Sequence, residues 1–431
     1  MWEGNEVSIT FYLEKGEVGG NQVLLSSNGE SLWLDFGLSF KKTRRYIDPI
    51  LEGKQLPKVN LEELSKEKII PPPEYFENGL RVLISHAHLD HYGAILAPLE
   101  HDIKVEIFAP EDTLKLVKSR METSGQSKLF EKATLIPCPK NSKFKVSDVF
   151  EVVPIEVDHS IDGSYSYLIF TTEKSILYTG DFRFDLVPSE RLIEEISRHT
   201  ENVDAMITEF TGVHRRNPLR EQDIQNEMER IKKKFPGLVV VFSSPSYTRR
   251  AQAIRSAFGE RELIMHSTYA YHLYMIGKGE FIDKVFVSEK KSALKSWERE
   301  LEKSGFEIVG EDYIKRNQRK AVVILPPYHK LKLDFDFESK SVAIISLTEP
   351  FDEEGFLFQS RLENFLMKWK HVPIYQIHAT GHAEAYEVAE FIEKLNPHDV
   401  YVIHSEAPET IYSLLPHRKN IHVPTYGTKS N

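Results

Sequence analysis

The chain has 431 residues, of which 41% are apolar and 28% charged, and its formal net charge is −10. This composition is typical of a folded globular protein and excludes a disordered or fibrous chain, while the length predicts two domains. The single cysteine excludes an internal disulfide and a thiolate zinc site, so any transition metal must be bound by imidazole and carboxylate groups. The acidic balance argues against a uniformly basic nucleic-acid binder.

The sequence carries no membrane or secretory signal. No stretch approaches the roughly 18–20 consecutive apolar residues of a membrane span. The first six residues lack the basic and then apolar pattern of a signal peptide. We therefore expect a cytoplasmic protein with no membrane partner.

Short apolar strands are predicted from the beginning of the chain. The patterns at 7–13, 22–25 and 31–35 favour strands, and Asn28-Gly29 predicts a type I′ hairpin turn between the second and the third. A further short buried strand at 81–85 leads directly to His86.

Three later strands also end in a polar side chain that could do chemistry. The strand at 175–178 leads to Asp181, the strand at 203–207 leads to Glu209, and the strand at 398–403 leads to His404. In α/β sheets, sites collect at the carboxyl ends of strands. Together with the strand before His86, these strands predict one shared site.

The middle of the chain has an α/β rhythm of its own and a different charge. Residues 211–375 hold 28 basic and 23 acidic residues, a net charge of +5, whereas the rest of the chain has a net charge of −15. This asymmetry predicts a mildly basic module inserted into an acidic one. Strands are predicted at 238–242, 285–287, 321–325 and 342–347, and helices at 248–255 and 292–301.

Four residues with metal-binding side chains lie within six positions, in the order His86-x-His88-x-Asp90-His91. A lone histidine is usually a surface or core residue, but this cluster at a strand exit favours metal binding. His86 and His88 can reach one cation, and Asp90 and His91 can reach a second. Imidazole and carboxylate suit zinc, and also manganese or iron. The further candidate ligands are His159, Asp181 and His404.

This run resembles the signature of the metallo-β-lactamase fold hydrolases. Asp35 is similar to the first acidic position of that family, and His159 and Asp181 resemble its third and fourth motifs. The resemblance implies an αββα sandwich that binds metal ions at the ends of its strands.

Other residues are similar to the β-CASP nucleases of that fold, the family that includes ribonuclease J. Glu209, His382 and His404 resemble motifs A, B and C, and 241–245 with Arg249 resembles the start of the inserted domain. The resemblance implies a Rossmann-like α/β insert at 211–375 between metallo-β-lactamase parts at 1–210 and 376–431. Since a histidine at motif C goes with RNA in that family, it also implies an RNA substrate.

The predicted reaction is hydrolysis of phosphodiester bonds in single-stranded RNA. Two divalent cations would activate a shared water and clamp the phosphoryl oxygens. We expect His86, His88 and His159 to bind one ion, Asp90, His91 and His404 to bind the other, and Asp181 to bridge them. Zinc is the expected metal, and manganese is the alternative. The catalytic set is Asp90, Glu209 and His382.

His382 is predicted to begin a helix that ends before Asn396-Pro397, where it could hold the scissile phosphate and protonate the leaving 3′-oxygen. Glu209 would orient it. The alternative is that both residues only support or cap their neighbours. The candidate substrate contacts are Gly381, Arg249 and Ser243. Further basic segments that could follow an RNA strand are 214–216, 249–250, 315–316 and 319–320.

Three other functions remain open at this point. A DNA nuclease of the same superfamily is disfavoured by His404, and a small-molecule hydrolase of the same fold is disfavoured by His382. A non-catalytic subunit is disfavoured by the complete ligand set. Whether the chain forms a homodimer, and whether it cuts within or from the end of an RNA, is left open.

Overall fold

The computed structural model describes residues 7–46, 60–213, 219–288, 293–327, 333, 335–347, 353–368 and 370–430, without the side chains of 44–46 and 353–358. The chain folds into two compact units. Unit 1 comprises Met1–Arg216 and Gly381–Asn431, and unit 2 comprises Asn217–Thr380. Unit 2 is therefore an insertion in unit 1, and each unit is described by itself below.

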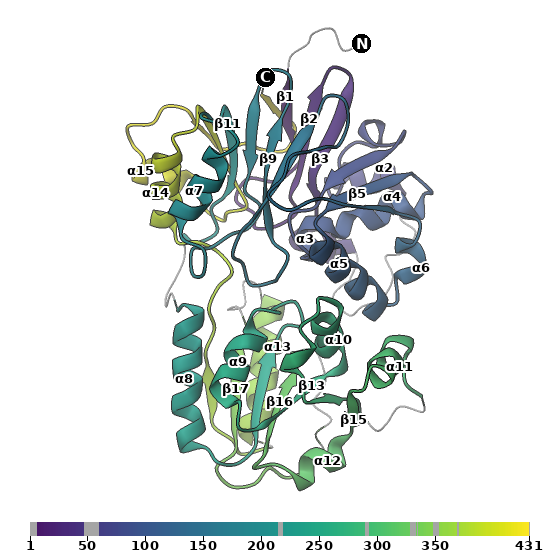
Figure 1. Ribbon diagram of the computed structural model, residues 1–431, viewed down its shortest axis with the longest axis vertical. Helices are drawn as coiled ribbons and strands as arrows, with labels where there is room; N and C mark the ends of the chain where they lie inside the picture. Colours follow the sequence, from purple (N-terminus) through teal and green to yellow (C-terminus); the bar gives the residue numbers. More distant parts are fainter. Residues whose placement is uncertain are drawn as a thin grey trace. The chain divides into compact units, whose positions relative to one another are not determined.

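Unit 1 is built on two sheets, each with seven strands among the described residues (Figure 1). The first contains, in spatial order, β21 (Thr428–Ser430), β1 (Ser8–Phe11), β2 (Gln22–Ser27), β3 (Glu30–Phe36), β4 (Leu80–Leu83), β5 (Val105–Ala109) and β6 (Thr134–Pro137). The second contains β20 (Ile421–His422), β19 (Asp399–Ile403), β11 (Ala205–Glu209), β10 (Ser175–Tyr178), β9 (Tyr165–Phe170), β8 (Glu151–Glu156) and β7 (Phe144–Lys145).

The predicted hairpin at Asn28-Gly29 is confirmed. β2 and β3 pair in antiparallel fashion on either side of it. Asn28 and Gly29 have φ angles of 48° and 78°. A type I′ turn needs positive φ at both central residues, and asparagine and glycine accept that conformation at the lowest cost.

The two sheets pack face to face, and helices cover their outer faces. Apolar side chains of both sheets, such as Leu34, Leu83, Tyr167 and Ile207, form one buried cluster between them. Figure 1 shows helices on the outer side of each sheet. The helices on the side of the first sheet are α2 (Leu61–Lys66), α3 (Leu89–Tyr92), α4 (Leu96–Glu100), α5 (Glu111–Thr123) and α6 (Ser127–Phe130). Those on the side of the second are α7 (Ser189–Ser197), α14 (Ala385–Leu395) and α15 (Ile411–Leu414). The αββα sandwich is confirmed.

Unit 2 is a parallel α/β fold. Its sheet has the order β15 (Glu307–Val309), β14 (Lys284–Phe286), β13 (Glu262–His266), β16 (Ala321–Leu325), β12 (Val239–Ser243), β17 (Val342–Ser346) and β18 (Ile374–Gln376). Every described pair in this sheet is parallel. Apolar clusters lie on both of its faces, which explains why its strands read as continuous apolar runs.

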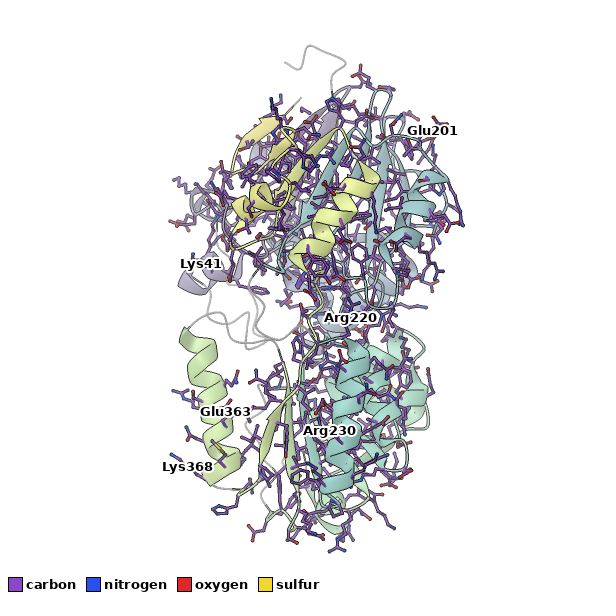
Figure 2. All side chains as sticks on the ribbon, turned by 90° about the vertical axis from the view of Figure 1, so that its left-hand side faces the viewer. Lys41, Glu201, Arg220, Arg230, Glu363 and Lys368 are labelled. Atoms are coloured by element: carbon purple, nitrogen blue, oxygen red, sulfur yellow. The ribbon has the colours of Figure 1, made fainter. Side chains whose placement is uncertain are left out.

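The helices of unit 2 are α8 (Glu221–Lys234), α9 (Arg250–Phe258), α10 (Ser267–Met275), α11 (Ser296–Lys303), α12 (Glu311–Arg316) and α13 (Glu353–Lys368). α8 precedes the first strand of the sheet, and the other helices alternate with strands from β12 onward, as in a Rossmann-like arrangement. Charged side chains project from the outer sides of α8 and α13, with Arg230 and Lys368 labelled in Figure 2. Arg250 on α9 is instead buried, and it donates to both oxygens of Glu221 at 2.9 and 3.0 Å.

Several predicted helix starts are wrong, since the helices expected from 248 and 292 begin at Arg250 and Ser296. The helix expected to begin at His382 begins at Ala385, and Glu384 and Glu387 cap its first turn. The carboxylates of Glu384 and Glu387 therefore accept from two amides of this turn, and their negative charge disfavours a phosphate at this helix end. Its predicted end is confirmed, since Asn396 adopts the left-handed conformation with φ 51° directly before Pro397.

Several elements were not predicted, among them β8, β9, α5 and α10. Among the described residues, no helix has the length and apolarity that crossing a membrane requires.

Candidate metal and catalytic site

The candidate residues of unit 1 are carried by strand ends and the loops that follow them. His86 and His88 follow β4, His159 follows β8, and Asp181 follows β10. Glu209 is the last residue of β11, and His404 follows β19. Since these strands belong to two facing sheets, their ends bring distant parts of the chain to one place.

The short helix α3, which carries Asp90 and His91, is fixed by a close backbone approach. Asp90 O accepts from Asn21 N at 3.2 Å, and Leu89 O accepts from Leu38 N at 3.1 Å. A Cβ on Gly37 would lie 1.6 Å from Asp90 O. Only glycine fits at position 37, and this close contact fixes the position of α3 relative to the end of β3.

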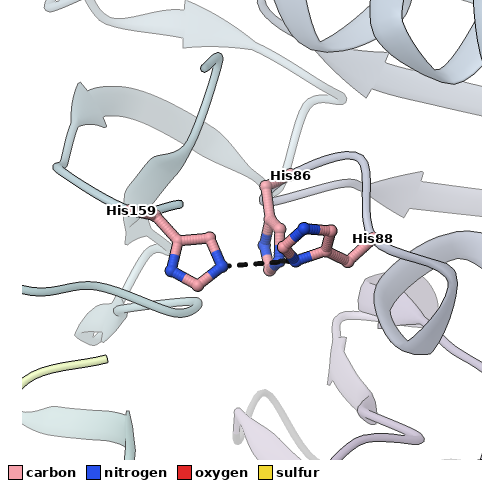
Figure 3. A group of neighbouring side chains, drawn as sticks. All are labelled: His86, His88 and His159. Carbon is pink, nitrogen blue, oxygen red and sulfur yellow. Dashed lines mark hydrogen bonds between the residues drawn. The ribbon is translucent and has the colours of Figure 1, made fainter. Parts of the chain in front are cut away.

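Three imidazole rings converge on one point (Figure 3). His88 Nδ1 lies 2.9 Å from His86 Nε2 and 3.2 Å from His159 Nε2. A tetrahedral ion with metal–nitrogen bonds of about 2.0–2.1 Å holds its ligand atoms roughly 3.3 Å apart. The spacing of this group, which we call the first triad, is close to that of a ligand set.

A second group, the second triad, consists of Asp90, His91 and His404. Their ligand atoms lie within 4.8 Å of one another. Asp90 Oδ2 is 3.4 Å from His404 Nε2 and 3.8 Å from His91 Nε2. This set mixes one carboxylate with two imidazoles, a combination suited to zinc or manganese.

Asp181 lies between the two triads. Its Oδ2 is 3.8 Å from His86 Nε2 and 4.0 Å from His159 Nε2 in the first triad. The same oxygen is 3.2 Å from His91 Nε2 and 3.7 Å from His404 Nε2 in the second. The structure thus places one carboxylate within reach of both groups.

In His91 and His159, a hydrogen bond at Nδ1 directs Nε2 toward the centre of the site, where it can act as a ligand. His91 Nδ1 donates to Asp35 Oδ2 at 2.6 Å, and His159 Nδ1 donates to the carbonyl oxygen of Gly381 at 2.6 Å. A ring that carries its proton on Nδ1 presents a lone pair at Nε2, as a metal ligand must. In addition, Asp181 Oδ1 is buried and accepts no hydrogen bond from the described residues. These residues fit a pair of divalent ions.

The first triad favours neutral imidazoles. Burial, and then the neighbouring imidazoles, hold the pKa of His86 well below its usual value. Burial likewise lowers the pKa of His159, and it lowers that of His88 to about 3. Neutral rings are the form that binds metal, because protonation would remove the lone pair.

The second triad and Asp181 carry charge. Burial acts to lower the pKa of His91, but Asp181, Asp35 and Asp90 outweigh burial and raise it well above its usual value. Burial would raise the pKa of Asp181, yet His404 and His91 hold it well below its usual value. The site therefore pairs ionised carboxylates with positive charge on the neighbouring imidazoles. A bound dication would supply positive charge at the same place.

His382 and Glu209 form a close couple beside the triads. His382 Nδ1 lies 3.0 Å from Glu209 Oε1 and 2.9 Å from Oε2. Glu209 Oε1 also accepts from Phe182 N at 2.8 Å, which holds the carboxylate in place. The His382 side chain is 19% exposed, whereas that of Glu209 is 1% exposed. His382 is therefore the partner that a substrate could reach.

Asp35 supports the site from behind. Its buried carboxylate accepts from Ser85 N and Oγ at 2.7 Å each, and from Tyr178 OH at 2.6 Å, in addition to His91. Ser85 and Tyr178 were not predicted to have a function, although both lie directly at the strand ends that lead to candidate ligands. Asp35 links β3, β4, β10 and α3 in one buried network.

Asp35→Ala is expected to lower the free energy of unfolding by about 3–5 kcal/mol, because several buried donors lose their acceptor at once. Urea unfolding followed by circular dichroism measures this. The control is Asp102→Asn, which removes the charge of a carboxylate that is 81% exposed and ion-paired with Lys132, and which suits the left-handed backbone at this position (φ 57°). The control should change stability by less than about 1 kcal/mol. Equal small effects of both variants would contradict the role of Asp35.

A second buried pair joins two of the loops and was also missed from the sequence. Arg183 Nε donates to Asp158 Oδ2 at 3.0 Å, and Arg183 N donates to Asp158 O at 2.8 Å. The pair directly adjoins His159 on one loop and follows Asp181 by two residues on the other. It ties together the loops that carry these two residues.

The predicted substrate contacts are placed in different surroundings. Gly381 belongs to unit 1, where its carbonyl holds His159 and a Cβ would lie 2.5 Å from that ring. Ser243 ends β12 in unit 2 and is fully buried, which does not favour direct contact with a substrate. Arg249 directly precedes α9 and is partly exposed. The predicted basic segment at 214–216 lies outside the described residues.

Comparisons with known proteins place this site in context. A family model described as "Beta-lactamase superfamily domain" matches residues 44–234. Ribonuclease J of Pyrococcus abyssi is 28% identical over 222 residues, which cover 49% of this chain and 47% of that protein. Ribonuclease J 2 of Streptococcus pyogenes serotype M3 is 24% identical over 291 residues, covering 65% of this chain and 48% of that protein. The chain thus spans about half the length of these relatives.

A crystal structure of a protein of unknown function from Enterococcus faecalis V583 has the same fold over nearly the whole chain. It covers 98% of this chain and 99% of its own, with a TM-score of 0.74 and 18% sequence identity. At that identity the likeness shows the fold alone. Together, the matched domain and the ribonuclease J relatives support a metallo-β-lactamase-fold, β-CASP, ribonuclease J-like family for this chain.

Proposed function

We propose that this protein is a metal-dependent ribonuclease that hydrolyses phosphodiester bonds of single-stranded RNA. The observation that carries the proposal is the position of Asp181 Oδ2, which lies 3.2–4.0 Å from ring nitrogens of two separate ligand triads. A carboxylate shared between two such groups is the arrangement expected of a dinuclear hydrolytic centre.

The first ion would be held by His86, His88 and His159, and the second by Asp90, His91 and His404, with Asp181 shared. Zinc is the metal proposed, and manganese is the alternative. When bound, the ions would generate a nucleophile from water at neutral pH and stabilise charge on the phosphoryl oxygens. Asp90, whose side chain is 14% exposed, also lies where a substrate could approach.

The leaving group would be served by His382. Its Nδ1 is engaged by Glu209, and its Nε2 would donate a proton to the departing 3′-oxygen. Glu209, itself held by Phe182 N, would keep the ring in the orientation that this transfer needs. Glu209 would thus position His382, and of these two residues only His382 would touch the substrate.

We propose the insert, unit 2, as the module that holds the RNA. Residues 217–380 hold 26 basic and 23 acidic residues, a net charge of +3, which supports contact with a phosphate backbone. Arg249 is the proposed contact best supported by its exposure, and Gly381 and Ser243 stay predictions. RNA is favoured over DNA by the ribonuclease names of the relatives and by His404 at the motif C position. Cytoplasmic location and a homodimer stay predictions.

Incubation with end-labelled RNA and a DNA of matched sequence tests the proposal, with and without a chelator. We expect the RNA to be cut and the DNA to be cut far more slowly. We also expect chelation to abolish cleavage and added zinc or manganese to restore it. Cleavage that survives chelation, or DNA cut as fast as RNA, would overturn the proposal. Product lengths separate cutting within the chain from cutting at its end.

A further inference from the structure

Thr211 contacts His404 at two points with one hydroxyl group. Its Oγ1 lies 2.8 Å from His404 Nδ1 and 2.8 Å from the backbone oxygen of His404. Thr211 also follows Glu209 by two residues, and its amide donates to Glu209 Oε2 at 3.3 Å. This residue therefore joins the end of β11 to the end of β19 inside unit 1.

The positions of the protons follow from these two contacts. A hydroxyl has one hydrogen, and a carbonyl oxygen can only accept, so Thr211 must donate to the backbone oxygen of His404. If Thr211 donated to the ring instead, two acceptor oxygens would face each other at 2.8 Å. The ring nitrogen must then donate to Oγ1. His404 therefore carries a proton on Nδ1.

We propose that Thr211 is a positioning residue that fixes the tautomer and ring orientation of His404, so that the Nε2 lone pair faces Asp90 and Asp181. Nε2 lies 3.4 Å from Asp90 Oδ2 and 3.7 Å from Asp181 Oδ2. Hydrogen bonds to the outer nitrogen of a ligating histidine set ring direction in this way. The inference rests on the proposed function, because it assigns a role in holding the second ion.

The backbone of His404 needs the same support. Its φ angle is 51°, in the left-handed region that residues with a β-carbon disfavour. The hydroxyl of Thr211 holds the His404 carbonyl in this conformation while it holds the ring. One side chain thus controls both the backbone turn after β19 and the direction of the imidazole.

A neighbouring threonine provides a matched control. Thr208 lies three residues earlier on β11 and is fully buried. Its hydroxyl donates to Glu209 O at 3.2 Å and lies 3.5 Å from Thr179 Oγ1, and neither contact involves a candidate ligand ring. Loss of this hydroxyl removes a buried hydrogen bond at the same strand but leaves His404 untouched.

The test is zinc affinity, measured by titration calorimetry in competition with a chelator, for the full chain and three variants. Thr211→Val should weaken binding of one of two ions about 10–100-fold. Thr211→Ser, which keeps the hydroxyl, should stay within about threefold of the unsubstituted protein. Thr208→Val should bind both ions with unchanged affinity. Equal affinities for Thr211→Val and the unsubstituted protein would overturn the inference.

The outcomes separate this inference from the proposed function. If the unsubstituted protein binds no zinc, the proposed function fails. If it binds two ions and Thr211→Val binds them equally well, only the role of Thr211 fails. Should Thr211→Val not fold, nitrogen NMR of the zinc-loaded unsubstituted protein decides. A proton on Nδ1 of His404 supports the inference, and a proton on Nε2 overturns it.

Discussion

Asp181→Asn is expected to lower kcat/KM on single-stranded RNA by about 10³-fold or more and to reduce the number of tightly bound metal ions. Among the described residues, Asp181 is the one carboxylate that lies within 4.0 Å of ring nitrogens of both triads. Metal ions supply several kcal/mol of charge stabilisation in such reactions, and each 1.36 kcal/mol is a tenfold change in rate. An amide of the same shape keeps the packing and removes the charge. Metal content by elemental analysis and initial cleavage rates measure the two effects.

Asp204→Asn is the matched control for this variant. Asp204 precedes β11 at the amino end of the strand, where its carboxylate accepts from Ser175 N and Oγ at 2.7 and 2.8 Å. The control therefore loses the charge of a hydrogen-bonded carboxylate on the same sheet, away from the strand ends that carry the site. It should keep its metal and its activity. Full metal content and activity in Asp181→Asn would exclude a shared carboxylate.

His382→Ala is expected to lower kcat by about 10²–10⁴-fold, the range for loss of a general acid, while metal content stays unchanged. His382 Nδ1 is 3.8 Å from Asp181 Oδ2 and is engaged by Glu209, so the ring does not complete either triad. Glu209→Gln should lower kcat by a smaller factor, because the ring remains but loses its orientation. The double variant should be no slower than His382→Ala alone, since the two residues act as one unit.

His417→Ala is the control, because this histidine is 65% exposed and pairs only weakly with Glu393. It should retain normal kcat. A fall in the metal content of His382→Ala would show that His382 is a metal ligand. The ligand atoms of Asp181, Glu209, His382 and His404 lie close enough together to hold an ion in that case. Additive losses in the double variant would separate Glu209 from His382.

Much of the fold could be predicted because its strands are short, apolar and bounded by polar residues. The strand at 175–178 and the hairpin at Asn28-Gly29 are local features, readable from spacing and turn chemistry alone. The start of α14 could not be read in this way. Helical spacing begins near His382, but the paired carboxylates of Glu384 and Glu387 move the first turn to Ala385.

The candidate ligands could be predicted for a different reason, since four of them are adjacent in sequence and the others end apolar strands. The supporting contacts could not. Ser85, Tyr178 and Asp35 come from three separate strands, and nothing in the sequence shows that they share one hydrogen-bond network. Thr211 and His404 are 193 positions apart, so only the folded chain brings the hydroxyl to the ring.

Stepwise reconstitution of metal-free protein tests the dinuclear site most directly. Zinc is added in known equivalents per chain, and the initial rate of cleavage of a labelled single-stranded RNA is recorded at each step. We expect no cleavage without metal, a rise with added zinc, and a plateau at two equivalents per chain. A plateau at one equivalent, or full activity before any metal is added, would contradict a site in which two triads share Asp181.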